Sequence, residues 1–277
     1  MIDHKQLVRI IESALAEDVN TGDITTMSTV PHDKRISGQF LAKASGVLCG
    51  VPVAQSVFEY VDPEVTLECL FADGDLVKKG DVLARISGRA ISVLTGERLA
   101  LNFLQRMSGI ASRTREAADK VAGFPVRILD TRKTTPGLRM LEKYAVRVGG
   151  GYNHRFTLSD GVLIKDNHIR AAGGITQAVQ AARGYVPHTL KIEVEVETLE
   201  QVEEALSAGA DIIMLDNMTN ELMAQAVQLI GNRALTEASG NMDEKDLRAV
   251  AATGVSFISI GALTNHIRPL DISLKFD

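Results

Sequence analysis

Two cations stand where a short apolar segment ends, in the stretch LDTRKTTPG that begins at Leu129. Residues 126–130 read as a strand and the Pro-Gly pair at 136–137 would end whatever follows, so Arg132 and Lys133 lie at the carboxyl end of that strand. A guanidinium group binds carboxylate or phosphate through two parallel hydrogen bonds, and an ammonium group adds a compact charge. Alone, the stretch favours an anion site no more than a solvated loop.

The same arrangement recurs along the second half of the chain, where further apolar runs also end in polar or glycine residues. Cations follow the early runs, carboxylates follow the middle ones, and the last two end in glycine-containing stretches whose backbone amides could approach a phosphate. The residues at these ends are Thr131, Arg132, Lys133, Lys165, Asp166, Asn167, His168, Glu195, Asp216, Asn217, Ser239, Gly240, Asn241, Gly261 and Ala262. If the runs are parallel strands of one sheet, these residues meet at one edge.

The run LKIEVEVE carries Glu193, Glu195 and Glu197 on one face, because side chains alternate along a strand. In a barrel we expect this face to point inward, where carboxylates need cations, hydroxyl groups or a metal ion as partners. An outward acidic face would suit an edge strand, but not one covered by helices. Glu195 and Asp216 would then form a pair on neighbouring strands, able to bind sugar hydroxyls or to hold Mg²⁺ through oxygen.

Opposite these acids we expect a cluster of cations with two histidines nearby. The cluster comprises Arg132, Lys133, Arg155 and Lys165, with His154 and His168. The six His of the chain show no repeated ligand spacing, which argues against a His-based zinc site, so His154 and His168 are expected to donate hydrogen bonds or to pack.

Charge is segregated along the chain. Residues 101–170 hold 13 Lys and Arg against six Asp and Glu, although the whole chain has a net charge of -5. The acidic total argues weakly against nucleic acid as a partner, and the basic segment indicates an anionic ligand unless it is only a solvated helix face.

Helical patterns alternate with the apolar runs from about residue 125 onward. They cover residues 138–148, 175–183, 199–208, 221–230 and 244–252. Such regular alternation predicts a parallel sheet, and six or seven units without a dinucleotide fingerprint favour a closed or nearly closed β/α barrel over a doubly wound sheet. In such a barrel the site lies at the carboxyl ends of the strands.

The first part of the chain predicts a different, α+β domain. It has an amphipathic N-terminal helix, strands around 37–44, 65–71 and 82–86, and a long helix at 92–121. The stretch GDLVKKGDVLARISG suggests a hairpin and resembles half of a lipoyl or biotinyl carrier, but it lacks the modifiable Lys between two Met, so a structural hairpin is favoured. The tail LDISLKF is expected to return as a strand to this domain. With neither a secretory pattern nor a run of membrane-spanning length, we expect a soluble cytoplasmic protein with no membrane partner.

Eight stretches resemble, in order, those of quinolinate phosphoribosyltransferase, the decarboxylating enzyme of NAD biosynthesis. They are AEDVNTGDITT, ERLALNFLQRMSGIAS, LDTRKTTPGLR, KYAVRVGGGYNHRFTLSDGVLIKDNHI, IEVEVE, IMLDN, EASGN and SIGALT. The resemblance covers the chain from about Asp18 to its end. It implies an α/β fold with an incomplete β/α barrel and an N-terminal α/β sandwich domain, the type II phosphoribosyltransferase arrangement. The implied domains are residues 1–113, joined by the strand at 266–277, and residues 114–265.

The resemblance also implies roles for individual residues. Arg132, Lys133, Arg155 and Lys165 would bind the two carboxylates of quinolinate and phosphate, with Thr131 and His154 beside them. Glu195 and Asp216 would hold the ribose hydroxyls and the Mg²⁺ that accompanies phosphoribosyl pyrophosphate, and no organic cofactor is implied. The loops around the 5-phosphate would be Ser239, Gly240 and Asn241, followed by Ile260, Gly261 and Ala262. Lys133, Lys165, Glu195 and Asp216 would be the catalytic residues, whereas Arg106 would reach the site from the neighbouring subunit of a homodimer or of a multiple such as a hexamer.

Two other activities remain open from the sequence. A related phosphoribosyltransferase acting on nicotinate or another aromatic acid would need fewer cations. A class I aldolase would use Lys165 to form a Schiff base.

Overall fold

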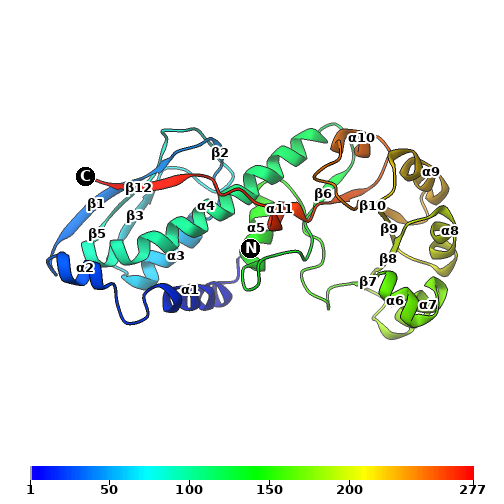
Figure 1. Cartoon of the computed structure of the whole chain (residues 1–277), viewed down its shortest axis with the longest axis horizontal. Coiled ribbons are helices and arrows are strands. Elements are labelled where there is room, and N and C mark those ends of the chain that lie inside the picture. Colours follow the sequence, from blue (N-terminus) through cyan, green and yellow to red (C-terminus); the bar gives the residue numbers. More distant parts are fainter. Residues whose placement is uncertain (1) are drawn as a thin grey trace. The chain divides into compact units, whose positions relative to one another are not determined.

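The computed structural model describes residues 2–277 and divides into two compact units (Figure 1). The barrel unit comprises residues 116–133 and 151–263, and the N-terminal unit comprises the rest of the described chain, including residues 134–150 and 264–277. Residues 134–150 therefore pack with the N-terminal unit, although the sequence grouped them with the barrel. The expected domain boundaries stay a prediction, because compactness does not show which segments fold independently.

A four-stranded antiparallel sheet in the order β12-β1-β5-β3 forms the centre of the N-terminal unit. Its strands are β1 (Arg35–Ala42), β3 (Thr66–Cys69), β5 (Val82–Arg89) and β12 (Ile272–Phe276). The helices of this unit are α1 (His4–Asp18), α2 (Ile24–Thr29), α3 (Val51–Val61), most of α4 (Ala90–Lys120) and α5 (Arg139–Val148). Phe40 on β1 meets Phe58 on α3 edge to face, with ring centroids 6.2 Å apart. Helix and sheet layers thus share one apolar core.

The tail pairs as expected, but the predicted hairpin is wrong. β12 runs antiparallel to β1, so the last residues complete the first sheet. In the Gly-Asp stretch, however, β4 (Leu76–Val77) pairs with β2 (Gly46–Val47), whereas β5 pairs with β1 and β3. The carboxylates of Asp75 and Asp81 accept backbone N–H groups within their own turns, and these two turns send β4 and β5 to different partners.

Six parallel strands form the sheet of the barrel unit, in the order β6-β11-β10-β9-β8-β7. They are β6 (Arg127–Leu129), β7 (Val162–Ile164), β8 (Ile192–Val196), β9 (Ile212–Asp216), β10 (Leu235–Ser239) and β11 (Phe257–Ser259). The first strand lies beside the last, as in a closed barrel, but within residues 2–277 no strand pairing joins β6 to β7. A single bridge between Leu129 and Tyr152 extends the sheet on that side. The barrel is therefore incomplete, as predicted.

Helices cover the outer side of this sheet (Figure 1). They are α6 (Asp166–Ala172), α7 (Ile175–Tyr185), α8 (Leu199–Ala208), α9 (Asn220–Ile230) and α10 (Leu247–Ala251). The short α11 (Ala262–Asn265) follows β11 and ends among residues of the other unit. The hydroxyls of Thr198 and Thr219 accept backbone N–H groups of α8 and α9 and fix where each helix begins after its strand. Such caps hold the strand-to-helix loops, from which the site is built. In the described part of the chain, no helix is both long and apolar enough to span a bilayer.

Candidate active site

Neighbouring strands of the barrel unit end at matching heights. Val196 lies beside Leu215, Asp216 beside Ser239, and Ser259 beside Leu129. The polar residues that the sequence placed after these strands therefore gather at one edge of the sheet, as expected for a β/α barrel. All of the predicted site residues except Arg106 belong to this unit.

Lys165 and Glu195 form an ion pair across the ends of β7 and β8, with the Lys165 Nζ 2.5 Å from a Glu195 carboxylate oxygen. The side chain of Lys165 is 45% exposed and that of Glu195 16% exposed. A predicted cation thus pairs with a predicted carboxylate, and the half-exposed Lys165 can turn from Glu195 toward a ligand. His168 accepts the backbone N–H of Lys165 through Nδ1 at 3.0 Å and so caps α6, a role that the expectation of a donor or packing residue did not include.

Unusual backbone marks the ends of β9 and β10. Asn217 and Asn241 have positive φ values of 54° and 50°, and Gly240 has a φ of 91°. The Asn217 N–H donates to the Ser239 carbonyl at 3.0 Å, and a Cβ at Gly240 would lie 2.2 Å from the Asn217 Oδ1. Left-handed conformations cost non-glycine residues free energy and cluster at ligand sites. The turn at Asn217 and the turn at Gly240, both beside Asp216, are therefore packed closely against each other.

Lys133 lies against the end of β11. A Cβ at Gly261 would approach the Lys133 Cδ to 2.9 Å and the Thr131 Oγ1 to 3.6 Å. The Lys133 N–H donates to Thr131 Oγ1 at 3.0 Å, which closes the turn after β6. Glycine at position 261 thus leaves room for the Lys133 chain over the last strand end, next to the buried Ile260 and Ala262.

Arg132 and Arg155 lie close enough for their charges to interact. Burial and the positive charge of Arg132 lower the pKa of Arg155, whereas Glu193 and Asp160 oppose this shift. One guanidinium nitrogen of Arg155 donates to the Gly161 carbonyl at 3.0 Å. Two neighbouring guanidinium groups repel each other unless an anion lies between them, so the geometry suits a ligand with more than one negative charge.

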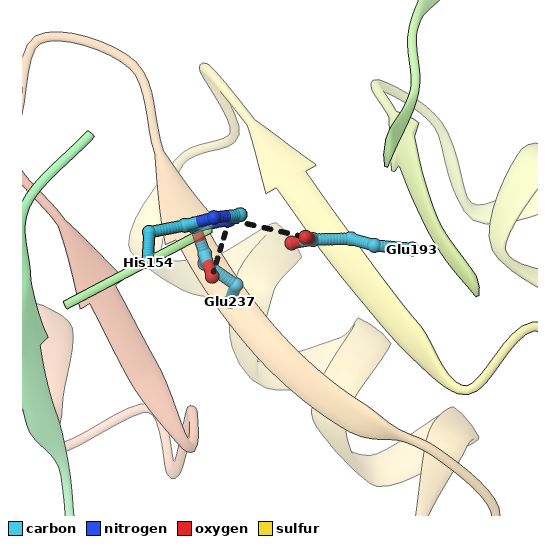
Figure 2. Close-up of side chains that lie close together, drawn as sticks. All are labelled: His154, Glu193 and Glu237. Atoms are coloured by element: carbon cyan, nitrogen blue, oxygen red, sulfur yellow. Dashed lines mark ion pairs between the residues drawn. The ribbon is translucent and has the colours of Figure 1, made fainter. Parts of the chain in front are cut away.

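His154, which precedes Arg155, forms a cluster with the buried Glu193 and Glu237 (Figure 2). The His154 Nε2 is 3.1 Å from a Glu193 oxygen and 3.7 Å from a Glu237 oxygen. Glu193 points inward, as the alternation in β8 predicted. Glu237 is a residue that sequence reasoning missed, although its position two residues before Ser239 on an inward-facing strand pattern could have indicated it.

Asp130 is a second missed residue. Its carboxylate is fully buried and accepts the His154 backbone N–H at 2.9 Å and the Asn153 side-chain amide at 2.5 Å. Backbone hydrogen bonds from Tyr152 to Ile128 and from Asp130 to Tyr152 attach the same loop to β6. The sequence reading passed over Asp130 as the last residue of the strand, but it holds in place the loop that carries His154 and Arg155.

Arg106 belongs to the N-terminal unit and contacts the buried Glu142. Its Nε and Nη2 donate to one Glu142 oxygen at 2.9 and 2.5 Å, and Nη2 also donates to Thr135 Oγ1 at 2.6 Å. The other Glu142 oxygen accepts the Thr135 backbone N–H at 3.1 Å. The guanidinium group is therefore held in one orientation within its own unit.

Two family models match almost the whole chain. The model of the quinolinate phosphoribosyl transferase N-terminal domain matches residues 23–108, and that of the C-terminal domain matches residues 110–275. The chain belongs to the quinolinate phosphoribosyltransferase family.

Relatives of this family resemble the chain over nearly its full length. A probable carboxylating nicotinate-nucleotide pyrophosphorylase of Bacillus subtilis is 45% identical over 99% of this chain and 94% of the relative. A chloroplastic carboxylating nicotinate-nucleotide pyrophosphorylase of Arabidopsis thaliana is 47% identical over 98% of this chain and 83% of the relative. The solved nicotinate-nucleotide pyrophosphorylase of Francisella tularensis is 39% identical, covers all of this chain and 98% of its own, and superposes with a TM-score of 0.95. The quinolinate phosphoribosyltransferase fold, with its incomplete barrel and N-terminal sandwich domain, is therefore the fold of this chain.

Proposed function

We propose that the chain converts quinolinate and phosphoribosyl pyrophosphate to nicotinate mononucleotide, pyrophosphate and CO₂ in de novo NAD biosynthesis. The observation that carries this proposal is the strand edge itself, where Arg132, Lys133, Arg155 and Lys165 gather with Glu195 and Asp216 in a protein of known family. Quinolinate brings two carboxylates and the co-substrate brings a phosphate and a pyrophosphate. The negative charge of these two substrates explains why an acidic chain contains a basic segment.

Binding of the pyridine is assigned to the cations. Arg132 and Arg155 would receive the two adjacent carboxylates, since their neighbouring charges are best offset by a dianion. Lys165 would add a third charge after leaving Glu195, and Lys133 would lie over the last strand ends with Thr131. A ligand with one carboxylate offsets less of this charge, which favours quinolinate over nicotinate.

The reaction needs positioning and electrostatics more than a nucleophilic side chain. The ring nitrogen attacks the anomeric carbon with its own lone pair, the bond to pyrophosphate breaks, and the electron pair leaves with pyrophosphate. Glu195 and Asp216 would stabilise the positive charge that grows on the ribose. The ring nitrogen then carries a positive charge. As the neighbouring carboxylate leaves as CO₂, the electron pair of the broken bond stays on the ring carbon, where the adjacent positive charge stabilises it, and that carbon takes up a proton.

The donor set at Glu195 and Asp216 fits Mg²⁺, which is bound by carboxylate oxygens and by substrate phosphates. Asp216 is half-buried and accepts the Asn217 amide at 2.6 Å, so one carboxylate oxygen is already oriented. When bound with phosphoribosyl pyrophosphate, Mg²⁺ would offset the negative charge of the leaving group. The backbone around Ser239, Gly240, Asn241, Ile260, Gly261 and Ala262 would surround the 5-phosphate.

Assembly belongs to the same proposal. We expect a cytoplasmic homodimer or a multiple of one, in which Arg106 of one subunit reaches the barrel unit of the other. Glu142 holds the Arg106 guanidinium group in one orientation, which would lower the entropy cost of placing it in the site of the neighbouring subunit.

A substrate panel with phosphoribosyl pyrophosphate and Mg²⁺ tests the activity. Quinolinate should give nicotinate mononucleotide and CO₂ in equal amounts, and nicotinate should give little product. Equal use of nicotinate, or product without CO₂, would assign the chain to a different reaction.

A further inference from the structure

His154, Glu193 and Glu237 form a cluster in which both carboxylates are buried and the imidazole is partly exposed (Figure 2). The two carboxylates come from β8 and β10, and the imidazole comes from the loop attached to β6. One ligand atom from each residue lies within 4.8 Å of the other two, so the set has the composition of a transition-metal site. One oxygen of each glutamate is buried without a hydrogen-bond partner.

The hydrogen bonds of the His154 ring indicate whether its Nε2 carries a proton or could bind a metal ion. The Arg155 backbone N–H donates to the His154 Nδ1 at 2.7 Å, so the lone pair of Nδ1 is in use and that nitrogen carries no hydrogen. Nε2 must then carry the proton of a neutral ring, and it lies at donor distance, 3.1 Å, from Glu193. A metal ion on Nε2 would require a ring with no proton at all. The cluster is therefore a hydrogen-bond assembly.

Its surroundings disfavour ionisation of the second carboxylate, Glu237. Burial, followed by the negative charge of Glu193, raises the pKa of Glu237 above its ordinary value, although the nearby His154 and a hydrogen bond with Ser259 oppose the shift. A protonated Glu237 can donate a hydrogen bond to the Glu193 carboxylate. Glu193 then accepts from two sides, and its single negative charge acts on Arg155.

These contacts lead to Arg155. The backbone N–H of Arg155 is fixed by Nδ1 of His154, the ring is fixed by Glu193, and the His154 backbone is fixed by Asp130. Glu193 also acts on the guanidinium charge itself, since it is one of the groups that raise the pKa of Arg155. A rotated imidazole would lose both ring contacts at once and release the Arg155 backbone.

We propose that His154 is a positioning residue that Glu193, supported by Glu237, holds as its neutral Nε2–H tautomer. In this state His154 orients Arg155 for the dicarboxylate and binds no metal ion. This inference rests on the proposed function for the identity of the dicarboxylate, but the tautomer does not depend on it. Both ring nitrogens of His154 contact other groups of the protein, so His154 affects the bound ligand through Arg155.

Two substitutions separate the two nitrogens of the ring. His154→Asn keeps an acceptor near the position of Nδ1, whereas His154→Gln keeps a donor near the position of Nε2. We expect His154→Gln to raise the KM for quinolinate at least about tenfold with a smaller effect on the KM for phosphoribosyl pyrophosphate, and His154→Asn to retain most of the quinolinate affinity. The exposed His188, on the loop before β8, provides the control His188→Ala, which should change neither constant. Equal losses in the two His154 variants, or equal effects on both substrates, would overturn the proposal.

Nitrogen-15 spectroscopy of histidine-labelled protein without substrate provides the second readout. The proposal predicts that His154 carries its proton on Nε2 near neutral pH. It also predicts that the purified protein contains no stoichiometric divalent metal whose binding depends on Glu237, so the metal content of wild type and Glu237→Gln should be equal. A proton on Nδ1, a charged ring or such a metal would refute it. If the wild type showed no quinolinate-dependent activity, the proposed function would fail while this tautomer could still be measured.

Discussion

At the scale of single residues, the site combines neighbouring like charges with buried opposite ones. The positive charge of Arg132 acts on Arg155, and the carboxylate of Glu193 partly offsets its effect on Arg155. Like charges brought together in this way are costly in the empty protein and favourable once a dianion is bound. The affinity for quinolinate should therefore depend strongly on either guanidinium.

Removal of one guanidinium tests this directly. Arg132→Ala or Arg155→Ala should weaken quinolinate binding by about 2 to 4 kcal/mol, because a carboxylate of the bound ligand would lose its charged partner. Isothermal titration calorimetry measures the difference. Arg183→Ala is the matched control, since Arg183 pairs with Asp211 at 2.8 Å before β9 and should not affect the affinity. Unchanged affinity in both site variants would show that the pocket lies elsewhere.

The buried acid pair makes stability depend on pH. The folded-state pKa of Glu237 is raised, so the folded protein binds more protons than the unfolded chain between the ordinary pKa of Glu, about 4.3, and the raised value. The contribution of Glu237 to the free energy of unfolding is therefore fully present below about pH 4.3 and is lost as the pH rises through the folded-state pKa.

Glu237→Gln isolates this contribution, because glutamine mimics the protonated acid and does not titrate. The free energy of unfolding of the wild type minus that of Glu237→Gln should fall as the pH rises, as measured by urea denaturation at a series of pH values. A difference that stays constant or increases with pH would mean that Glu237 is ionised in the folded protein.

At the scale of elements, tight turns at the strand ends position the site. Gly240 and Gly209 both have positive φ, 91° and 86°, but only at Gly240 would a Cβ meet another residue, the Asn217 side chain at 2.2 Å. Gly209 ends α8 and has open space around it. Substitution of these two glycines therefore distinguishes the cost of backbone strain alone from the cost of strain together with steric crowding.

Gly209→Ala should lower the free energy of unfolding by about 1 kcal/mol, the ordinary cost of a left-handed alanine. Gly240→Ala should cost about 1 to 3 kcal/mol more, because the Asn217 turn must also shift. Denaturant unfolding of the two variants measures this difference. Equal losses would show that the turn beside Asp216 is not closely packed.

Local patterns predicted most elements but not their partners. Periodicity located the barrel strands and the helices α7, α8, α9 and α10 to within a few residues, since alternation and caps are local signals. It missed the short helices α6 and α11. The pairing of strands is not a local property. A two-residue strand such as β4 is too short for its sequence to indicate which strand it pairs with, so the hairpin prediction failed. Asp130 and Glu237 escaped notice for a related reason. Their importance depends on a loop and a strand that meet only when the barrel forms.

At the scale of the whole molecule, most of the proposed site lies in the barrel unit, whereas Arg106 lies in the N-terminal unit. Membership in the quinolinate phosphoribosyltransferase family covers both units. The proposed trans role of Arg106 makes activity a property of an assembly rather than of one chain.

Complementation tests this role. A chain with Arg106→Ala, mixed with a chain with Lys165→Ala, should regain part of the activity, because each heterodimer contains one site with neither substitution. Steady-state assays on heterodimers isolated with two affinity tags measure the recovery. Heterodimers that remain inactive would place Arg106 and Lys165 in the same site of a single chain.

The most direct test of the central claim is a crystal structure of the protein with bound quinolinate. The two carboxylates of quinolinate should contact the guanidinium groups of Arg132 and Arg155 at the carboxyl ends of the barrel strands, with Lys165 turned from Glu195 toward the ligand. Quinolinate bound at any other place, with Lys165 still paired to Glu195 and both guanidinium groups without contact to the ligand, would contradict the account.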